Sequence, residues 1–196
     1  MMSEKIKKAF TLFDEYNAQS PEQIEWEGVT YPAELLYALK LYEWVKKLDA
    51  NPGEALLLAS RCQHIGRWEI PRSNYPEGRL GYLKWKGDLA KFHAAKSAEL
   101  LAKAGYEQQI ISRVQEINLK QKLKSDPEVH TMENALCLVF LEFQYDALIT
   151  KMGEEKMIPI LQKSWAKMTE AGRVAALTLP YSHSGKAILE KALVNP

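Results

Sequence analysis

Apolar positions recur at helical spacing along most of the chain, and they predict a protein built almost entirely of helices. Ile6, Phe10 and Phe13 mark a first helix at about residues 4–16. The segment 33–48 is apolar on two faces, which is typical of a helix at the centre of a fold. The same pattern, with ends marked by Asn, Asp, Pro and Gly, predicts further helices over 51–66, 80–104, 107–122, 131–152, 154–171 and 185–193.

One short segment departs from the helical pattern. From Ile24 to Tyr31, apolar and polar residues alternate around the pair Glu27-Gly28. Alternation with period two about a glycine-containing pair is typical of a β-hairpin. The 196 residues contain no repeat, low-complexity tract or linker. The sequence therefore predicts one compact all-α domain over residues 1–196, with a short β-hairpin near the N-terminus.

The composition is typical of a globular protein, with 46% hydrophobic and 26% charged residues. The longest apolar run is the seven residues from Ala135 to Leu141, whereas a membrane span needs about 20, so we expect no contact with a membrane. Residues 1–10 lack the apolar stretch of a secretory signal. Cys62 and Cys137 both lie in apolar helical segments. We therefore expect a cytoplasmic protein with two buried thiols.

The chain is nearly neutral overall, with 26 basic and 25 acidic side chains, but its middle segment has a net positive charge. Residues 67–124 carry 12 basic and 6 acidic groups, whereas residues 1–55 carry 6 and 10. The small net charge excludes a general polycation for nucleic acid, but a basic region can attract phosphate groups. An ordinary solvated helix face with ion pairs between successive turns explains the same charges.

The loop from Trp68 to Tyr82 is rich in large aromatic and arginine side chains, which is unusual for a loop. Guanidinium groups match phosphate oxygens, and aromatic rings stack on bases. The alternative is a loop held onto the core by its rings, with arginines capping helix ends. The candidate phosphate-binding residues in and beside this loop are Arg67, Arg72, Arg79 and Lys84.

Three side chains from separate predicted helices could carry chemistry. His64 ends an apolar helix, His93 borders an apolar stripe, and Glu142 directly follows an apolar run. Histidine is a frequent base and metal ligand, and a buried carboxylate needs a cation, a metal or a proton. The structural alternative is that His64 and Glu142 bond to arginines in a buried polar network that fixes helix packing.

Several segments together resemble an uncharacterised family: Tyr31–Ala38, Arg61–Arg72, Tyr75-Pro76, Gly81–Trp85 and Cys137–Glu142. They are similar to domain-of-unknown-function family 4202, over about residues 31–193. This resemblance implies membership of the family, for which no activity is established.

A more distant resemblance is to the HD-domain phosphohydrolases, which hold divalent metals between helices. The turn Gln63–Arg67 resembles the His-Asp-Ile-Gly-Lys turn of that family, with Gln63-His64 in place of His-Asp. Tyr37 stands near the position of the family's first His, and Glu142 replaces its late Asp. The resemblance implies a degenerate HD-like domain whose remodelled metal site would be His64, His93 and Glu142. Imidazole with carboxylate favours manganese, iron, nickel or zinc over magnesium.

These features predict a domain that binds a phosphate-containing small molecule, with a nucleotide as the leading candidate. If the protein is an enzyme, we expect metal-dependent phosphoester hydrolysis with His64 and Glu69 as the catalytic residues. The alternative is a non-catalytic module that binds RNA or a partner protein through residues 67–85. The sequence leaves the substrate and the oligomeric state open.

Overall fold

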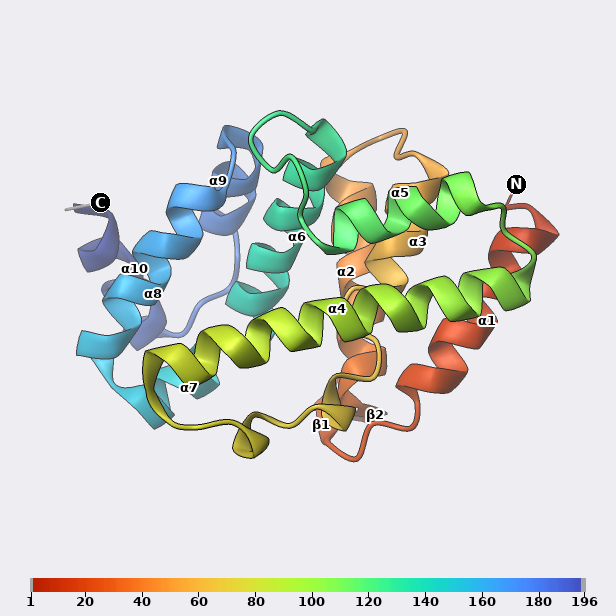
Figure 1. Ribbon diagram of the computed structural model, residues 1–196. Helices are drawn as coiled ribbons and strands as arrows, with labels where there is room; N and C mark the ends of the chain where they lie inside the picture. Colours follow the sequence, from red (N-terminus) through yellow and green to blue (C-terminus); the bar gives the residue numbers. More distant parts are fainter. Residues whose placement is uncertain (1, 195–196) are drawn as a thin grey trace.

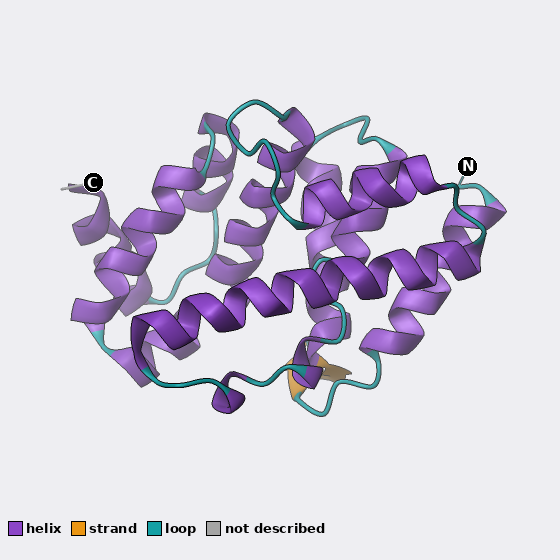
Figure 2. Cartoon of the chain, in the orientation of Figure 1, coloured by secondary structure: helices purple, strands orange, loops and turns teal. Residues whose placement is uncertain are grey.

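A computed structural model describes residues 2–194 as a set of packed helices with one small hairpin (Figure 1, Figure 2). The prediction of a compact all-α fold with an N-terminal hairpin is confirmed. Within residues 2–194, no helix has the length and apolar character needed to cross a bilayer. In chain order the α-helices and strands are α1 (Glu4–Asn17), β1 (Gln23–Trp26), β2 (Val29–Pro32), α2 (Ala33–Leu48), α3 (Glu54–Cys62), α4 (Gly78–Ala104), α5 (Gln108–Asn118), α6 (Pro127–Phe143), α7 (Tyr145–Met152), α8 (Glu154–Lys167), α9 (Glu170–Leu177) and α10 (His183–Val194).

Local sequence sets several of these boundaries. The Ser3 side chain accepts a hydrogen bond from the Ile6 amide at the start of α1. Asp126 does the same for two amides of α6, where Pro127 occupies the first helical position. Gly105 ends α4 in the left-handed conformation with φ 90°. The two strands pair antiparallel, with Gln23 opposite Pro32, and β2 leads directly into α2.

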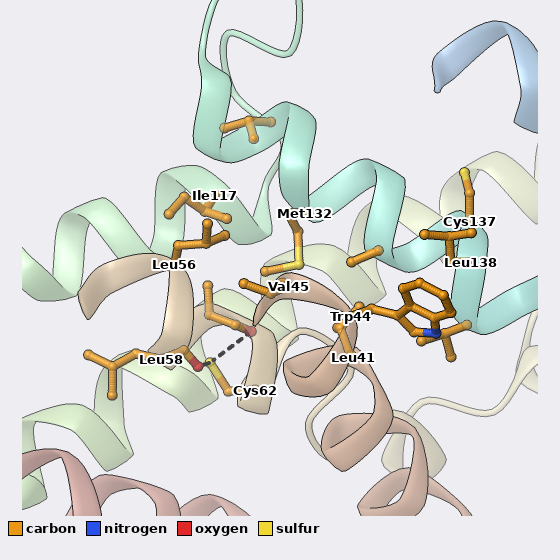
Figure 3. Close-up of a cluster of buried hydrophobic side chains, with 14 of the residues drawn as sticks. Leu41, Trp44, Val45, Leu56, Leu58, Cys62, Ile117, Met132, Cys137 and Leu138 are labelled. Atoms are coloured by element: carbon orange, nitrogen blue, oxygen red, sulfur yellow. Dashed lines mark hydrogen bonds between the residues drawn. The ribbon is translucent and has the colours of Figure 1, made fainter. Parts of the chain in front are cut away.

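The core lies where α2, α3, α5 and α6 meet (Figure 3). Leu56, Met132 and Leu138 are fully buried there, and Figure 3 shows them within the buried cluster, Leu56 on α3 and the other two on α6. The Cys62 thiol donates a hydrogen bond to the Leu58 carbonyl at 3.2 Å. Both Cys62 and Cys137 are free and buried, and burial raises the pKa of each thiol to about 12. The prediction of two buried thiols is therefore confirmed.

The long helix α4 crosses one face of the molecule (Figure 1). Helices α1 and α5 pack against it, whereas α8, α9 and α10 gather at the far end of the fold around α6 and α7. The first turns of α4 leave Leu80 and Leu83 largely exposed. The segment that joins α3 to α4 includes two short 3-10 turns, at Arg67–Glu69 and Arg72–Asn74.

The helix expected over 131–152 is broken in the structure, so that prediction was wrong at Gln144. The chain leaves helical geometry there, at φ −122° and ψ −24°, and begins again as α7. The next residue, Tyr145, is fully buried and donates a hydrogen bond to the Gly185 carbonyl at 2.9 Å. Burial of this large ring against α10 redirects the chain, and a contact so distant in sequence leaves no mark on local periodicity.

Two further boundaries differ from the sequence prediction. The helix expected to run to residue 122 ends at Asn118, because Lys120 and Lys122 adopt left-handed conformations with φ 55° and 56°. The helix expected over 154–171 is two helices, since α8 ends at Lys167 and α9 begins at Glu170. The amide of Thr169, between them, donates to the Asn134 side chain at 2.9 Å.

Candidate functional site

The turn after α3 places His64 and Arg67 between two cavities, and both residues line both of them. The turn is closed by hydrogen bonds from Ile65 N to Cys62 O and from Arg67 N to His64 O, each of 3.2 Å. Gly66 adopts φ 65°, and a Cβ atom there would lie 2.9 Å from ring carbons of Tyr16 and of Phe92. Glycine is therefore required for this turn on both conformational and steric grounds.

The first cavity, of about 250 Å³, lies between this turn, the N-terminal half of α4 and the end of α5. Three cationic side chains line it, one from each wall: Arg67, Lys86 and Lys120. The rest of the lining is formed by aromatic, apolar and amide side chains of the same three segments. These residues are Gln63, His64, Tyr82, Trp85, Leu89, Ala90, His93, Asn118 and Leu119.

The first cavity is electropositive because two of its three cations lack a carboxylate partner. Within the described residues, neither Arg67 nor Lys86 forms an ion pair, and each lies over an aromatic ring of α4. The Lys120 ammonium is 2.5 Å from the Glu133 carboxylate. Burial lowers the pKa of Lys86, and the charges of Lys167 and Lys120 lower it further.

The rings of His64 and His93 lie side by side at this cavity, with centroids 5.9 Å apart. Burial lowers the pKa of His93 to about 4 and the pKa of His64 well below its usual value, and the charge of Arg67 adds to both effects. Both imidazoles are therefore neutral near pH 7. His93 Nδ1 lies 2.7 Å from the Ile65 carbonyl, so in the neutral ring Nδ1 carries the proton and donates.

The second cavity, of about 300 Å³, lies on the other side of His64 and Arg67 and contains a buried carboxyl. Glu34 is 8% exposed and its Oε2 atom has no hydrogen-bond partner among residues 2–194. Burial raises the pKa of Glu34, Arg67 lowers it, and Glu22 raises it, and together they bring it to about 7. A carboxyl that titrates near neutrality beside a neutral imidazole is suited to proton transfer.

Several residues predicted to share one site lie elsewhere. Arg72 donates to the carbonyls of Tyr75 and Pro76, at 2.8 Å each, so it stabilises its own loop. Arg79 is exposed and lines neither cavity. Glu69 accepts a hydrogen bond from the Tyr16 hydroxyl, and it lines a separate hollow together with Lys84. The structure therefore brings His64, Arg67 and His93 together and separates them from Glu69, Arg72, Arg79 and Lys84.

The metal ligands implied by the resemblance do not fit a metal in this arrangement. The Glu142 carboxylate accepts a hydrogen bond from the Trp44 indole at 2.6 Å and lines neither cavity. His93 keeps Nε2 free, since its Nδ1 donates to the Ile65 carbonyl, but the carboxylate that should join it is held by Trp44. Across residues 2–194, no group of three or more His, Cys, Asp or Glu side chains is placed to hold a metal ion. We therefore derive no chemistry through a metal.

The sequence reasoning missed Glu34, Lys86, Asn118 and Lys120. Glu34 stands among apolar residues at the start of α2, and a carboxylate in such a run is a signal of burial. Lys86 lies one helical turn after Tyr82 on α4, so the spacing in the sequence places the two side chains on the same face of that helix. Lys120 reaches the cavity from a left-handed turn that contains no glycine, and no local signal identifies it.

A family model described as Domain of unknown function (DUF4202) matches residues 7–189, which is nearly the whole chain. The chain belongs to this family. The predicted membership is confirmed, and DUF4202 itself assigns no activity. No curated protein and no solved structure matches the chain. What a DUF4202 domain does with these two cavities must therefore be argued from their own residues.

Proposed function

We propose that this DUF4202 domain binds a phosphate-containing small molecule, a nucleotide, in the first cavity. The observation that carries this proposal is the pair of cations, Arg67 and Lys86, that face one cavity without a carboxylate partner among the described residues. Arg67 is half-buried, and a cation withdrawn from water without a counter-charge is costly, so a bound phosphate would supply the missing charge. Lys86 is exposed and adds attraction for the same anion. Arginine adds a planar fork that matches two phosphate oxygens.

The surroundings of the cations favour a nucleotide over a bare anion. The rings of Tyr82 and Trp85 lie side by side on α4, with centroids 5.8 Å apart, and both line the same cavity. Tyr82 is 46% exposed, so part of its ring is open to stacking by a base beside the Lys86 ammonium.

Hydrolysis of a phosphoester is proposed at His64 and Arg67, which line both cavities, because Glu34 lines only the second cavity and Lys86 only the first. In the proposed step the oxygen of a water molecule attacks phosphorus, and neutral His64 accepts the water proton. The bond from phosphorus to the leaving oxygen breaks, and that oxygen takes the proton of the Glu34 carboxylic acid. The products are an alcohol and inorganic phosphate. Arg67 and Lys86 stabilise the negative charge that develops on the phosphoryl oxygens.

Calorimetric titration with AMP, GMP, CMP and UMP at low salt tests the binding proposal. We expect Lys86→Met to weaken binding by about tenfold, because a charge-assisted hydrogen bond is lost. The matched control is Lys91→Met, since Lys91 is an exposed lysine on the same helix that does not line the cavity. The proposal fails if no mononucleotide binds, or if the two variants bind equally well.

The RNA-binding alternative predicts a different result in the same assay. A module that uses the whole segment 67–85 should bind a single-stranded oligonucleotide far more tightly than a mononucleotide, with a steep salt dependence. It should also depend on the exposed residues Arg79 and Lys84. Tight RNA binding that is lost in Arg79→Ala and unchanged in Lys86→Met would replace the proposal with this alternative.

A further inference from the structure

Three nearly buried polar side chains line the first cavity and each leaves one atom without a hydrogen-bond partner. Gln63, His93 and Asn118 are 5%, 4% and 3% exposed. The unpartnered atoms, within the part of the chain that the structure describes, are Oε1 of Gln63, Nε2 of His93 and Oδ1 of Asn118. Buried polar atoms in proteins are normally paired, so three at one cavity require an explanation.

The hydrogen bonds that are present fix the chemical character of these atoms. Gln63 Nε2 donates to the Asn118 carbonyl at 3.1 Å, and Asn118 Nδ2 donates to the Ser97 hydroxyl oxygen at 3.2 Å. That hydroxyl in turn donates to the His93 carbonyl. Since His93 Nδ1 donates to Ile65, each of the three side chains directs a donor into the protein. The atoms left over are all acceptors.

A ligand that satisfies three acceptors must present several donors, and the charges around the cavity restrict what those donors are. Arg67, Lys86 and Lys120 line the same cavity, so they disfavour an ammonium group there. Neutral hydroxyl groups satisfy the acceptors without this repulsion. The same cations attract a phosphate, so one molecule that carries both groups matches the whole cavity.

We infer that Gln63, His93 and Asn118 bind the hydroxyl groups of a phosphorylated sugar whose phosphate lies against Arg67 and Lys86. This inference rests on the proposed function and names its ligand class: a sugar phosphate, either free or as the ribose phosphate of a nucleotide. A site built to bond a hydroxyl rejects an analogue that lacks it, because the buried acceptors then stay unpaired in the complex. Hydroxyl recognition is therefore the source of specificity, and the cations supply affinity.

Two pairs of probes test the inference on the unmodified protein by calorimetry. The first pair is ribose 5-phosphate and tetrahydrofurfuryl phosphate, which keeps the ring and the phosphate but lacks the ring hydroxyls. The second pair is AMP and its 2′,3′-dideoxy analogue. We expect the hydroxyl-bearing member of at least one pair to bind at least about tenfold more tightly. If the protein distinguishes the members of the first pair, the ligand is a free sugar phosphate. If it distinguishes only the members of the second pair, the ligand is a nucleotide. Equal binding within both pairs would overturn the inference.

A pair of glutamine variants then locates the recognition. Gln63→Met removes one acceptor at similar side-chain volume, so we expect it to reduce the preference for hydroxyl-bearing probes several-fold. Gln115→Met is the control, because Gln115 also donates to a backbone carbonyl, that of Ala94, but does not line the cavity. Thermal melting establishes that both variants are folded. If Gln63→Met keeps the full preference of the unmodified protein, the assignment to Gln63 is wrong.

The failure of this inference can be told apart from failure of the proposed function. If both probes of each pair bind equally and Lys86→Met weakens them all, phosphate binding stands and hydroxyl recognition falls. If no phosphorylated probe binds, the proposed function falls and the inference falls with it. The comparison between probe pairs needs no variant, so it holds even where Gln63→Met does not fold.

Discussion

The guanidinium of Arg67 lies 5.2 Å from the centre of the Trp85 ring. A cation over an indole face is held by the quadrupole of the ring, and its charge is not cancelled as it would be by a carboxylate. Arg67 is therefore positioned before any ligand arrives, and an anion does not have to displace a protein partner. Preorganisation of this kind lowers the cost of binding.

Replacing this arginine should separate ligand binding from stability. We expect Arg67→Met to weaken phosphate-ligand binding by about tenfold or more, because a charge-assisted contact is lost. The free energy of unfolding should change by less than about 1 kcal/mol, the value of one cation–π contact. Calorimetry and urea unfolding measure the two quantities. The control is the exposed Arg79, and equal affinities of Arg67→Met and Arg79→Met would contradict the assignment.

Glu34 should make the protein less stable as the pH rises. Burial raises the pKa of Glu34 to about 7 in the folded state, compared with an ordinary value of 4.5. Between these two values the folded state holds a proton that the unfolded state releases, so the free energy of unfolding falls as pH rises through this window. Across this window the raised pKa of Glu34 lowers the free energy of unfolding by roughly 3 kcal/mol.

The variant Glu34→Gln tests this dependence. It should flatten the pH dependence of stability between pH 4.5 and 7 and leave the variant more stable than the unmodified protein at pH 8. Urea unfolding at pH 5 and pH 8 provides the measurement. Glu43→Gln, at an exposed position on the same helix, is the control and should leave the slope unchanged. A slope that survives in Glu34→Gln would show that another group titrates.

Two glycines of α4 should respond to alanine in opposite directions. A Cβ atom at Gly81 would lie 1.9 Å from the Pro76 carbonyl oxygen, whereas a Cβ atom at Gly87 meets nothing within 4 Å. Gly81→Ala must therefore push the loop before α4 away from the helix, and we expect a loss of about 1–3 kcal/mol. Gly87→Ala should gain about 0.5–1 kcal/mol, since alanine is the better helix former. Thermal melting of both variants shows whether each substitution raises or lowers the melting temperature. Two changes in the same direction would contradict the close packing at Gly81.

The buried Glu133 should be more important for stability than its neighbours on the surface. Its carboxylate is 3% exposed and pairs with Lys120 at 2.5 Å and Lys167 at 3.4 Å. We expect Glu133→Gln to cost about 2 kcal/mol at pH 7, because the buried carboxylate loses its charge-assisted contacts with two lysines. Glu116→Gln, which removes an exposed partner of Arg113, should cost less than about 1 kcal/mol.

The pH dependence of that cost distinguishes the ion pair from packing. Burial opposes ionisation of Glu133, but the two lysines outweigh it and lower its pKa. A lowered pKa stabilises the fold above the ordinary value of 4.5, and this stabilisation is lost as the pH falls through the folded value. The difference between Glu133→Gln and the unmodified protein should therefore shrink on acidification. A cost that stays constant down to pH 3 would identify lost packing as its cause.

The helical architecture could be predicted from the sequence because it rests on local signals. Period-two alternation around Glu27-Gly28 marked the hairpin, and the breakers before α4 and after it marked its ends. Gln144 shows where this reasoning stops. It is neither glycine nor proline, yet the helix ends there because Tyr145 is buried against α10. Such a break depends on a partner 40 residues away.

The candidate site was predicted only in its local part. His64 was found because it ends an apolar helix, Arg67 because it adjoins the aromatic loop, and His93 because it borders the apolar stripe of α4. Glu142 was assigned to the same site because it follows an apolar run and because the HD-domain resemblance implied an acidic ligand there, but its carboxylate accepts a hydrogen bond from Trp44 instead. Lys120 escaped notice because its place at the cavity depends on backbone conformation. Which side chains converge is decided by packing between helices, and residue type alone does not reveal it.

The tight fit around Gly66 restricts which substitutions related chains can accept at this position. The α-carbon there is pressed between the rings of Tyr16 and Phe92, so any larger residue would displace the very backbone that carries His64 and Arg67. A related chain that replaced this glycine would have to shrink one of those rings in the same lineage to keep both cavities. Glycine at this position, with aromatic residues at the other two, should therefore be a signature that separates descendants with an intact site from those that have lost it.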